Sequence, residues 1–275
     1  MSTITRFAVP GLLAIAGAAS AIAQESRSEV ACGDDWFGGN RSIHVCESRE
    51  FTLTREESLE INGRPNGSVS VTGGGGNAIQ VRALVRSWDR DEAAARDRLD
   101  EIEINTDGVL RAYGPDVRNS WSLFGRRNGG WNVDFEIMAP PDTDLWIESV
   151  NGRISVADMR GNLDAETVNG GISLVNVSTS ARGRTVNGGI SAEFADGTFD
   201  GEIFDVRTTN GGIVMRIPED FSARLDVETV NGGVSSDFPV TREGRRNREV
   251  SATLGNGGPL IRARTVNGGV QIRQF

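Results

Sequence analysis

The seven-residue segment TVNGGIS occurs at residues 167–173 and again at 185–191 of this 275-residue chain. Variants of it recur along the second half of the chain, and the asparagines that align are Asn151, Asn169, Asn187, Asn210, Asn231 and Asn267. Successive asparagines lie 18, 18, 23, 21 and 36 residues apart, and the last interval is twice 18. Weaker copies stand at Asn66 and Asn256. A period of this length indicates a repeat architecture, in which each unit packs against its neighbours.

The residues before each asparagine alternate between two kinds. In the second repeat, Leu163, Ala165 and Thr167 are apolar or small, whereas Asp164 and Glu166 between them are charged. This period of two predicts a strand with one buried face. After the Asn-Gly pair the alternation resumes with Ile or Val, followed mostly by Ser. Each unit therefore contains two short strands joined at the Asn-Gly pair.

Two arrangements of these strands are compatible with the pattern. Asn-Gly between alternating strands usually indicates a two-residue hairpin. A hairpin does not explain why the same residue types return at the same offsets in successive units, whereas parallel stacking of the units does. Stacking would align the threonines in an inner column and the asparagines in an amide ladder. The glycines would allow positive φ at the corner and leave no side chain against the next unit. We therefore predict an all-β parallel β-solenoid with about 18–23 residues per rung.

The part of the chain before the repeats also predicts strands, at 68–71, 79–85, 109–113 and 131–137. Residues 89–102 are rich in Ala, Arg, Leu and Glu, which predicts one short helical excursion. Pro140 and Pro141 mark the entry to the regular repeats. We expect a single solenoid domain at 51–275, with irregular rungs over 51–140 and regular Asn-Gly repeats over 141–275.

Residues 1–23 have the pattern of a signal peptide. Arg6 precedes an apolar run, and AIA, which ends at Ala23, is a small-residue cleavage site. The alternative, a membrane anchor, needs about 20 apolar residues. No later apolar run is that long, so we expect no transmembrane segment in the mature chain. The pattern predicts export to the periplasm, the outer surface or the medium.

The N-terminal segment 24–50 contains both cysteines of the chain, Cys32 and Cys46. In an exported protein such a pair predicts a disulfide, although two free thiols or a metal site are alternatives. His44 is the only histidine, and one His with two Cys makes a poor zinc site. We expect no metal and no cofactor. The net charge of −9 argues against nucleic acid as a partner, because phosphate binding needs a basic face.

The irregular strands, the segment IMAPPDTDLWIESVNGRISV and the TVNGGI repeats after it together resemble the bacterial putative-adhesin family of unknown biochemical function. They also resemble the head domains of autotransporter adhesins. The resemblance covers roughly residues 50–275. It implies a right-handed parallel β-solenoid that is secreted or associated with the cell envelope, and it brings no catalytic residue.

The first functional hypothesis is a non-enzymatic surface-binding module, an adhesin that holds a glycan, peptidoglycan or envelope protein on the long faces of the solenoid. The segment at 119–133 is rich in Gly, Trp and Arg; it predicts either a ligand platform or a hairpin tip whose aromatic side chains cover the solenoid end. The candidate ligand contacts are Trp121, Trp131, Trp146, Arg126 and Arg127.

Two alternatives stay open. Parallel β-helices also include polysaccharide-active enzymes, and the carboxylates of Asp164, Asp205 and Asp226 would share one column. However, each lies in a repeating pattern of charges, and the repeats contain no histidine for a Ser-His or Cys-His arrangement. We therefore predict that the chain is not an enzyme. The second alternative is end-to-end self-association, since a last rung without a cap would expose strand edges.

Overall fold

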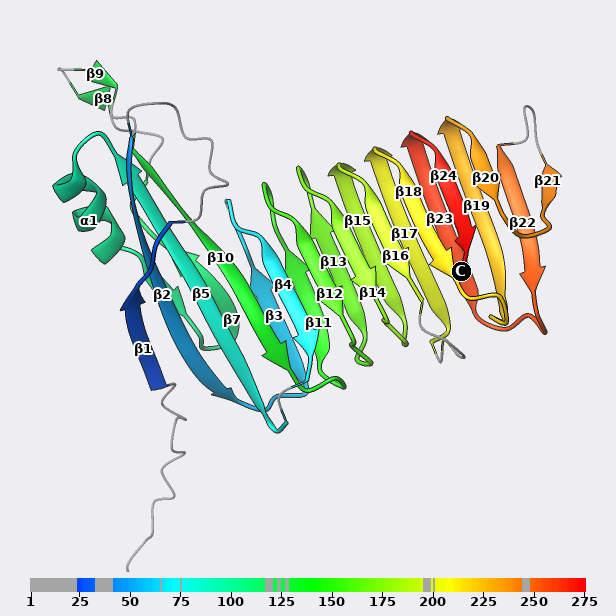
Figure 1. The fold of residues 1–275 in the computed structure, drawn as a ribbon, viewed down its shortest axis with the longest axis horizontal. Helices are drawn as coiled ribbons and strands as arrows, with labels where there is room; N and C mark the ends of the chain where they lie inside the picture. The colour runs from blue at the N-terminus through cyan, green and yellow to red at the C-terminus, as the bar shows by residue number, and fades with distance from the viewer. Residues whose placement is uncertain are drawn as a thin grey trace, which may run out of the picture.

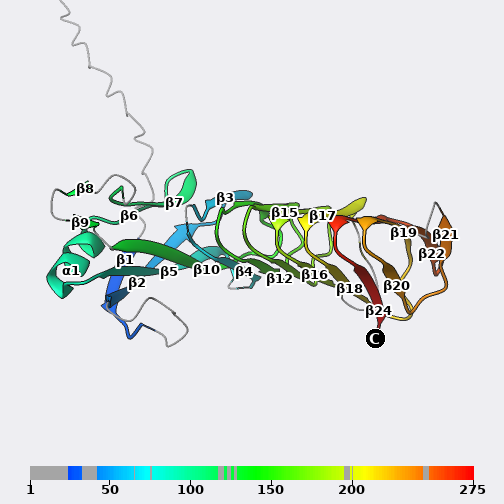
Figure 2. The same cartoon turned by 90° about the horizontal axis from the view of Figure 1, so that it is seen from above.

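The computed structural model describes residues 24–32, 42–64, 66–74, 76–116, 121–122, 125–126, 129–194, 199, 201–243 and 248–275. The predicted signal peptide at 1–23 lies outside these residues. Within them the chain forms two sheets of eleven strands each, one hairpin of two short strands and one helix. The two sheets face each other along the length of the molecule (Figures 1 and 2).

Sheet A consists, in spatial order, of β1 (Gln24–Glu29), β2 (Ile43–Thr54), β5 (Ala78–Asp89), β10 (Gly130–Ala139), β4 (Val69–Gly73), β12 (Ile154–Ala157), β14 (Ile172–Val175), β16 (Ile190–Glu193), β18 (Ile213–Ile217), β24 (Val270–Gln274) and β20 (Val234–Ser236). Sheet B consists of β21 (Thr241–Glu243), β22 (Glu249–Leu254), β19 (Ala223–Asn231), β23 (Leu260–Asn267), β17 (Ile203–Asn210), β15 (Ala181–Asn187), β13 (Leu163–Thr167), β11 (Asp144–Glu148), β3 (Ser58–Asn62), β7 (Val109–Tyr113) and β6 (Glu103–Asn105). The hairpin is β8 (Trp121–Ser122) with β9 (Gly125–Arg126), and the helix is α1 (Glu92–Asp100).

Consecutive strands of the two sheets, joined at an Asn-Gly corner, make the rungs. In spatial order the rungs are β3–β4, β11–β12, β13–β14, β15–β16, β17–β18, β23–β24 and β19–β20. Neighbouring rungs pair in parallel and in register, so that Ile154, Ile172 and Ile190 lie over one another. The predicted parallel β-solenoid is therefore confirmed, and the hairpin alternative is excluded for the repeats.

The final two strands do not follow the order of the sequence. β23–β24 lies between β17–β18 and β19–β20 in both sheets (Figure 1). The expectation that each repeat stacks on its sequence neighbour was wrong here, because equivalent motifs in β19–β20 and β23–β24 make either order compatible with the pattern. The last rung, β19–β20, is extended in sheet B alone, and β20 is the edge strand of sheet A. β22 pairs antiparallel with β19, and β21 pairs antiparallel with β22, beyond that rung.

Only one of the two weak copies of the motif forms the corner of a rung. Asn66 belongs to the first rung, and the side-chain amide of Asn151 donates to its Oδ1 at 2.8 Å. Asn256 lies instead in the turn between β22 and β23, where Gly255, Gly257 and Gly258 have positive φ. The doubled interval of 36 residues therefore contains the β21–β22 excursion rather than a missing rung.

The corners are held by two columns of hydrogen bonds. The asparagine side chains form the predicted ladder, in which Asn187 donates to Asn169 at 2.8 Å and accepts from Asn210 at 2.8 Å. Beneath the ladder, each buried threonine hydroxyl donates to a glycine carbonyl of the adjacent rung, as Thr185 does to Gly170 at 2.8 Å. The threonine bonds satisfy buried hydroxyls that would otherwise have no partner, whereas the asparagine ladder is exposed.

The N-terminal end of the molecule is not a regular solenoid. β2 and β10 each pair antiparallel with β5, and α1 lies at this end of the two sheets (Figure 2). The helix and the strands predicted over 68–137 are confirmed. The buried guanidinium of Arg49 donates to the backbone oxygens of Leu99 and Ile102 at the end of α1. The predicted disulfide between Cys32 and Cys46 is also present, and it joins the segment after β1 to β2.

Candidate functional site

The outer face of sheet B carries three columns of outward side chains that run across the rungs. Column 1 consists of Glu60, Trp146, Asp164, Arg182, Asp205, Arg262 and Asp226; column 2 of Asn62, Glu148, Glu166, Arg184, Arg207, Arg264 and Glu228. Column 3, next to the corner, consists of Val150, Val168, Val186, Thr209, Val266 and Val230. Parallel in-register pairing creates these columns, because each position of the repeat lies over the same position of the next rung.

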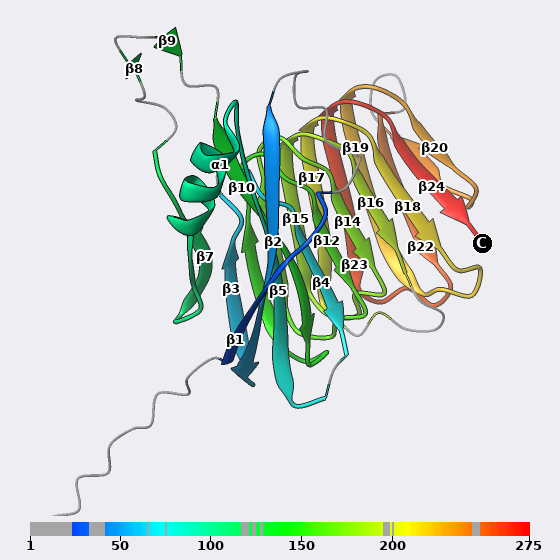
Figure 3. The ribbon, with the colours of Figure 1, turned by 60° about the vertical axis from the view of Figure 1, so that its left-hand side comes forward.

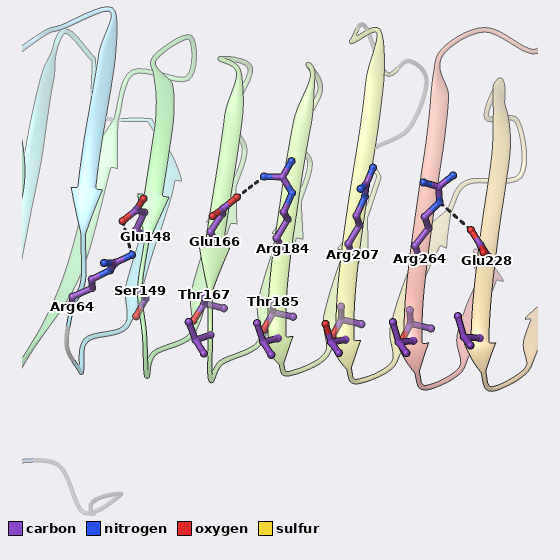
Figure 4. A pocket seen from close by; sticks show the side chains of 17 residues that line it. Arg64, Glu148, Ser149, Glu166, Thr167, Arg184, Thr185, Arg207, Glu228 and Arg264 are labelled. Atoms are coloured by element: carbon purple, nitrogen blue, oxygen red, sulfur yellow. Dashed lines mark hydrogen bonds and ion pairs between the residues drawn. The ribbon is translucent and has the colours of Figure 1, made fainter.

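A groove of about 560 Å³ runs between column 2 and column 3. It begins at Arg64 beside the first rung and ends at Glu228 and Val230 in the last rung. Figure 4 shows the charged side chains on one side and the corner side chains on the other. Four valines of column 3 are 39–46% exposed, which makes one wall of the groove apolar along most of its length.

Each arginine of the groove has a carboxylate partner. Arg64 contacts Glu148 at 3.0 Å, Arg184 pairs with Glu166, and Arg264 contacts Glu228 at 3.3 Å. Arg207 donates two hydrogen bonds to the buried carboxylate of Asp205, at 3.1 and 2.6 Å, and this bonding raises its pKa. The polar wall is therefore a series of ion pairs, and no single charge sign dominates it.

The charges of column 1 alternate in the spatial order of the rungs. From the third rung onward the order is Asp164, Arg182, Asp205, Arg262 and Asp226. In sequence order Asp205 and Asp226 would be neighbours, and the insertion of β23 places Arg262 between them. Arg262 Nε contacts Asp226 Oδ2 at 2.9 Å. The alternation removes like-charge contacts between neighbouring strands, which destabilise sheets.

Trp146 interrupts the charged pattern of column 1. Its side chain is 46% exposed, and its lateral neighbours are Glu60 and Asp164. A hollow of about 400 Å³ lies beside it and is lined by Glu60, Trp146, Ile147, Glu148, Asp164 and Glu166. The pKa of Asp164 is raised, mainly because the carboxylate is partly removed from water, and Arg184 opposes the shift.

The other predicted ligand contacts do not form one cluster with Trp146. Trp131 lies in β10 of sheet A; it is 8% exposed, and its Nε1 donates to the Pro115 carbonyl at 2.9 Å. Little of its surface is left for a ligand. Trp121 and Arg126 lie in β8 and β9, where the structure describes the backbone alone, and Arg127 lies outside the described residues.

The valines of column 3 were missed by the sequence analysis. The repeat pattern predicted an inward Thr and an Asn at the corner, but no prediction was made for the face of the residue between them. The signal was available, because Val stands one place before the asparagine at Val168, Val186, Val230 and Val266. A strand that turns directly after this position must expose it, since the preceding Thr is inward.

The described part of the chain contains neither a metal-binding cluster nor a membrane-spanning helix. No group of three or more His, Cys, Asp and Glu side chains there could hold a metal ion. In the same residues, the helix is too short and too polar to cross a bilayer.

Several solved structures match the chain at low sequence identity. A structure named as a putative cell adhesion protein from Clostridium sporogenes is 12% identical, with a TM-score of 0.44; the match covers 83% of this chain and 100% of that one. A putative adhesin from Bacteroides fragilis is 10% identical, with a TM-score of 0.39, covering 83% and 97%. A putative lipid binding protein from Parabacteroides distasonis is 10% identical, with a TM-score of 0.31, covering 86% and 98%.

No curated protein matches the chain. The family model of Toastrack DUF4097 matches residues 117–273, which is more than half of the chain and spans the rungs from β11–β12 onward. The chain therefore belongs to the Toastrack DUF4097 family.

Proposed function

We propose that this protein is an exported, non-enzymatic binding module of the cell envelope, an adhesin-like protein that holds one extended ligand chain along the groove of sheet B. The groove between columns 2 and 3 is the observation that carries the proposal. It crosses seven rungs, which at about 4.8 Å per rung gives a length of roughly 29 Å.

The dimensions of the groove limit the shape of the ligand. The groove is elongated, because its volume of about 560 Å³ is spread over seven rungs. A single extended chain matches this shape. A linear glycan or a peptidoglycan strand also has the required chemistry, because its sugar rings offer apolar faces to the valines and hydroxyls to the ion pairs.

Two further observations support this role. The disulfide between Cys32 and Cys46 is typical of proteins in oxidising compartments, which supports export to the periplasm, the outer surface or the medium. The carboxylates of the groove are engaged in ion pairs that recur from rung to rung, whereas a hydrolase needs two carboxylates with separate roles at one position.

The test is a glycan and peptidoglycan array with a matched pair of variants. Val186 in the groove and Met138 on sheet A are both 42% exposed, so a charge at either position leaves the core intact. Val186→Asp should abolish retention on any bound polymer, because it places a carboxylate on the apolar wall, and Met138→Asp should retain it. Equal binding by the two variants, or no binding by the native chain to any polymer, would refute the groove as the ligand site.

A further inference from the structure

Trp146 is an exception to the repeat, and the exception is on the surface. The six other members of column 1 are charged: Glu60, Asp164, Arg182, Asp205, Arg262 and Asp226. A large aromatic side chain that is 46% exposed leaves much of its apolar surface in water, so packing alone does not explain it. Places where a sequence departs from its own structural rule are expected at functional sites.

The hollow beside Trp146 is electronegative. Four carboxylates line it, those of Glu60, Glu148, Asp164 and Glu166, and no arginine is among its lining residues. Glu148 and Glu166 have arginine partners on the groove side of column 2. Glu60 has no ion pair with any described residue.

Asp164 has a buried carboxylate oxygen that is not satisfied. Its Oδ1 has no hydrogen-bond partner among the described residues. Nη1 of Arg184 lies 4.0 Å from this oxygen, beyond hydrogen-bond distance. A buried acceptor without a donor costs free energy, and a ligand that brings positive charge would recover it.

We propose that this hollow binds an organic ammonium group, with the cation over the Trp146 indole and the carboxylates around it. The face of an indole attracts cations, and Trp is the strongest of the aromatic side chains in this respect. A metal ion is a poorer occupant, because the carboxylates do not converge into a group that could ligate one. A neutral sugar could stack on the indole, but it would leave the four charges without a counterpart.

The site is separate from the groove. Column 2 lies between them, so Glu148 and Glu166 border both, while Trp146, Glu60 and Asp164 border the hollow alone. The two sites can therefore be tested independently on the same protein.

The experiment is a titration of the full chain with choline, followed by calorimetry. The neutral isostere 3,3-dimethyl-1-butanol and the disaccharide cellobiose are titrated separately as uncharged comparison ligands. Choline should bind and the two neutral probes should not. Trp146→Ala should weaken choline binding by roughly 5- to 30-fold, as expected for the loss of a partly desolvated cation–π contact. Glu60→Gln should also weaken it, and more strongly at low salt.

The matched control is Asp226→Asn, at the far end of column 1, which should leave choline binding unchanged. Circular dichroism of each variant would verify that the fold is intact. The proposal is overturned if choline does not bind, if the neutral isostere binds equally well, or if Trp146→Ala retains full affinity. Binding of cellobiose alone would also overturn it and assign the hollow to a neutral sugar.

Discussion

The first glycine of each Asn-Gly corner has no room for a side chain. A Cβ on Gly188 would lie 2.0 Å from the carbonyl oxygen of Gly170 in the adjacent rung, which is a clash with backbone. Its φ is not positive, so the sequence-based expectation of a left-handed corner was wrong. The sequence also led us to expect that close stacking of the rungs leaves no space for a side chain at these glycines, and this is confirmed. The second glycine is less restricted, and Arg153 occupies that place in the second rung.

The corner predicts a large difference between two Gly→Ala substitutions. Gly188→Ala should lower the free energy of unfolding by about 3 kcal/mol or more, because two rungs must separate to admit the methyl group. Gly233→Ala should be neutral or slightly stabilising, since a Cβ there meets no atom within 4 Å. Chemical denaturation monitored by circular dichroism measures both. Equal stability of the two variants would show that the rungs are not packed this closely.

At the scale of the strand, stability depends on the register between neighbouring rungs. Register places threonine over threonine and asparagine over asparagine, and each polar column then satisfies itself from rung to rung. The same register holds the inward Ile and Val side chains of the sheet A strands in one continuous core. A slip of one residue in a strand would exchange its buried and exposed faces, so the hydrophobic pattern and the polar columns specify the same pairing.

The ladder predicts that an interior asparagine contributes more than a terminal one. Asn187 makes two side-chain bonds within the ladder, whereas Asn231 in the last rung makes one, to Asn267 at 2.9 Å. Asn187→Ala should therefore cost roughly twice as much as Asn231→Ala, on a scale of about 0.5–1.5 kcal/mol per bond. Thermal unfolding of the two variants tests this. A larger loss for Asn231→Ala would contradict the ladder as a source of stability.

At the scale of the molecule, the insertion of β23–β24 makes the last segment of the chain part of the interior of the stack. The stack therefore ends with β19–β20 and the β21–β22 excursion rather than with the final strands (Figure 1). Figure 3 shows the opposite end, where β2 and β5 lie in front of the rungs. The antiparallel β21–β22 pair and the three-residue strand β20 leave little regular edge for another copy to extend. Short and irregular edges of this kind oppose end-to-end pairing.

Engineered disulfides should report this topology. Val214→Cys with Gln271→Cys should form a crosslink under oxidising conditions, because these residues are register partners in β18 and β24. Val214→Cys with Ser235→Cys should not, since β24 lies between them and the two positions are roughly 10 Å apart, beyond the reach of a disulfide. Non-reducing electrophoresis of a proteolytic digest distinguishes the pairs. A crosslink in the second pair alone would mean that the rungs stack in the order of the sequence.

The candidate site was less predictable than the fold. The sequence indicated Trp146 as a contact, but it gave equal weight to Trp131, which lies in the core of sheet A. Trp146 stands five places before Asn151, the offset of the outward charged residues in the other repeats, whereas Trp131 lies before the repeats, where no period assigns its face. The apolar column at Val168, Val186, Val230 and Val266 was visible as a repeat, yet its role as one wall of a groove emerges only when the rungs lie side by side.

The sequence by itself determined the solenoid, because a residue type that returns at the same offset in every unit is compatible with stacking in register and with little else. It also predicted the inward threonines and the asparagine ladder, which are local consequences of the motif, and it favoured a disulfide over two alternatives. The order of the last two rungs was decided only by the tertiary structure. Their motifs are interchangeable, and the choice between them depends on contacts between distant segments, such as Arg262 with Asp226 and β22 with β19. The groove and the hollow beside Trp146 were also decided only by the tertiary structure, because each is made by side chains from several rungs.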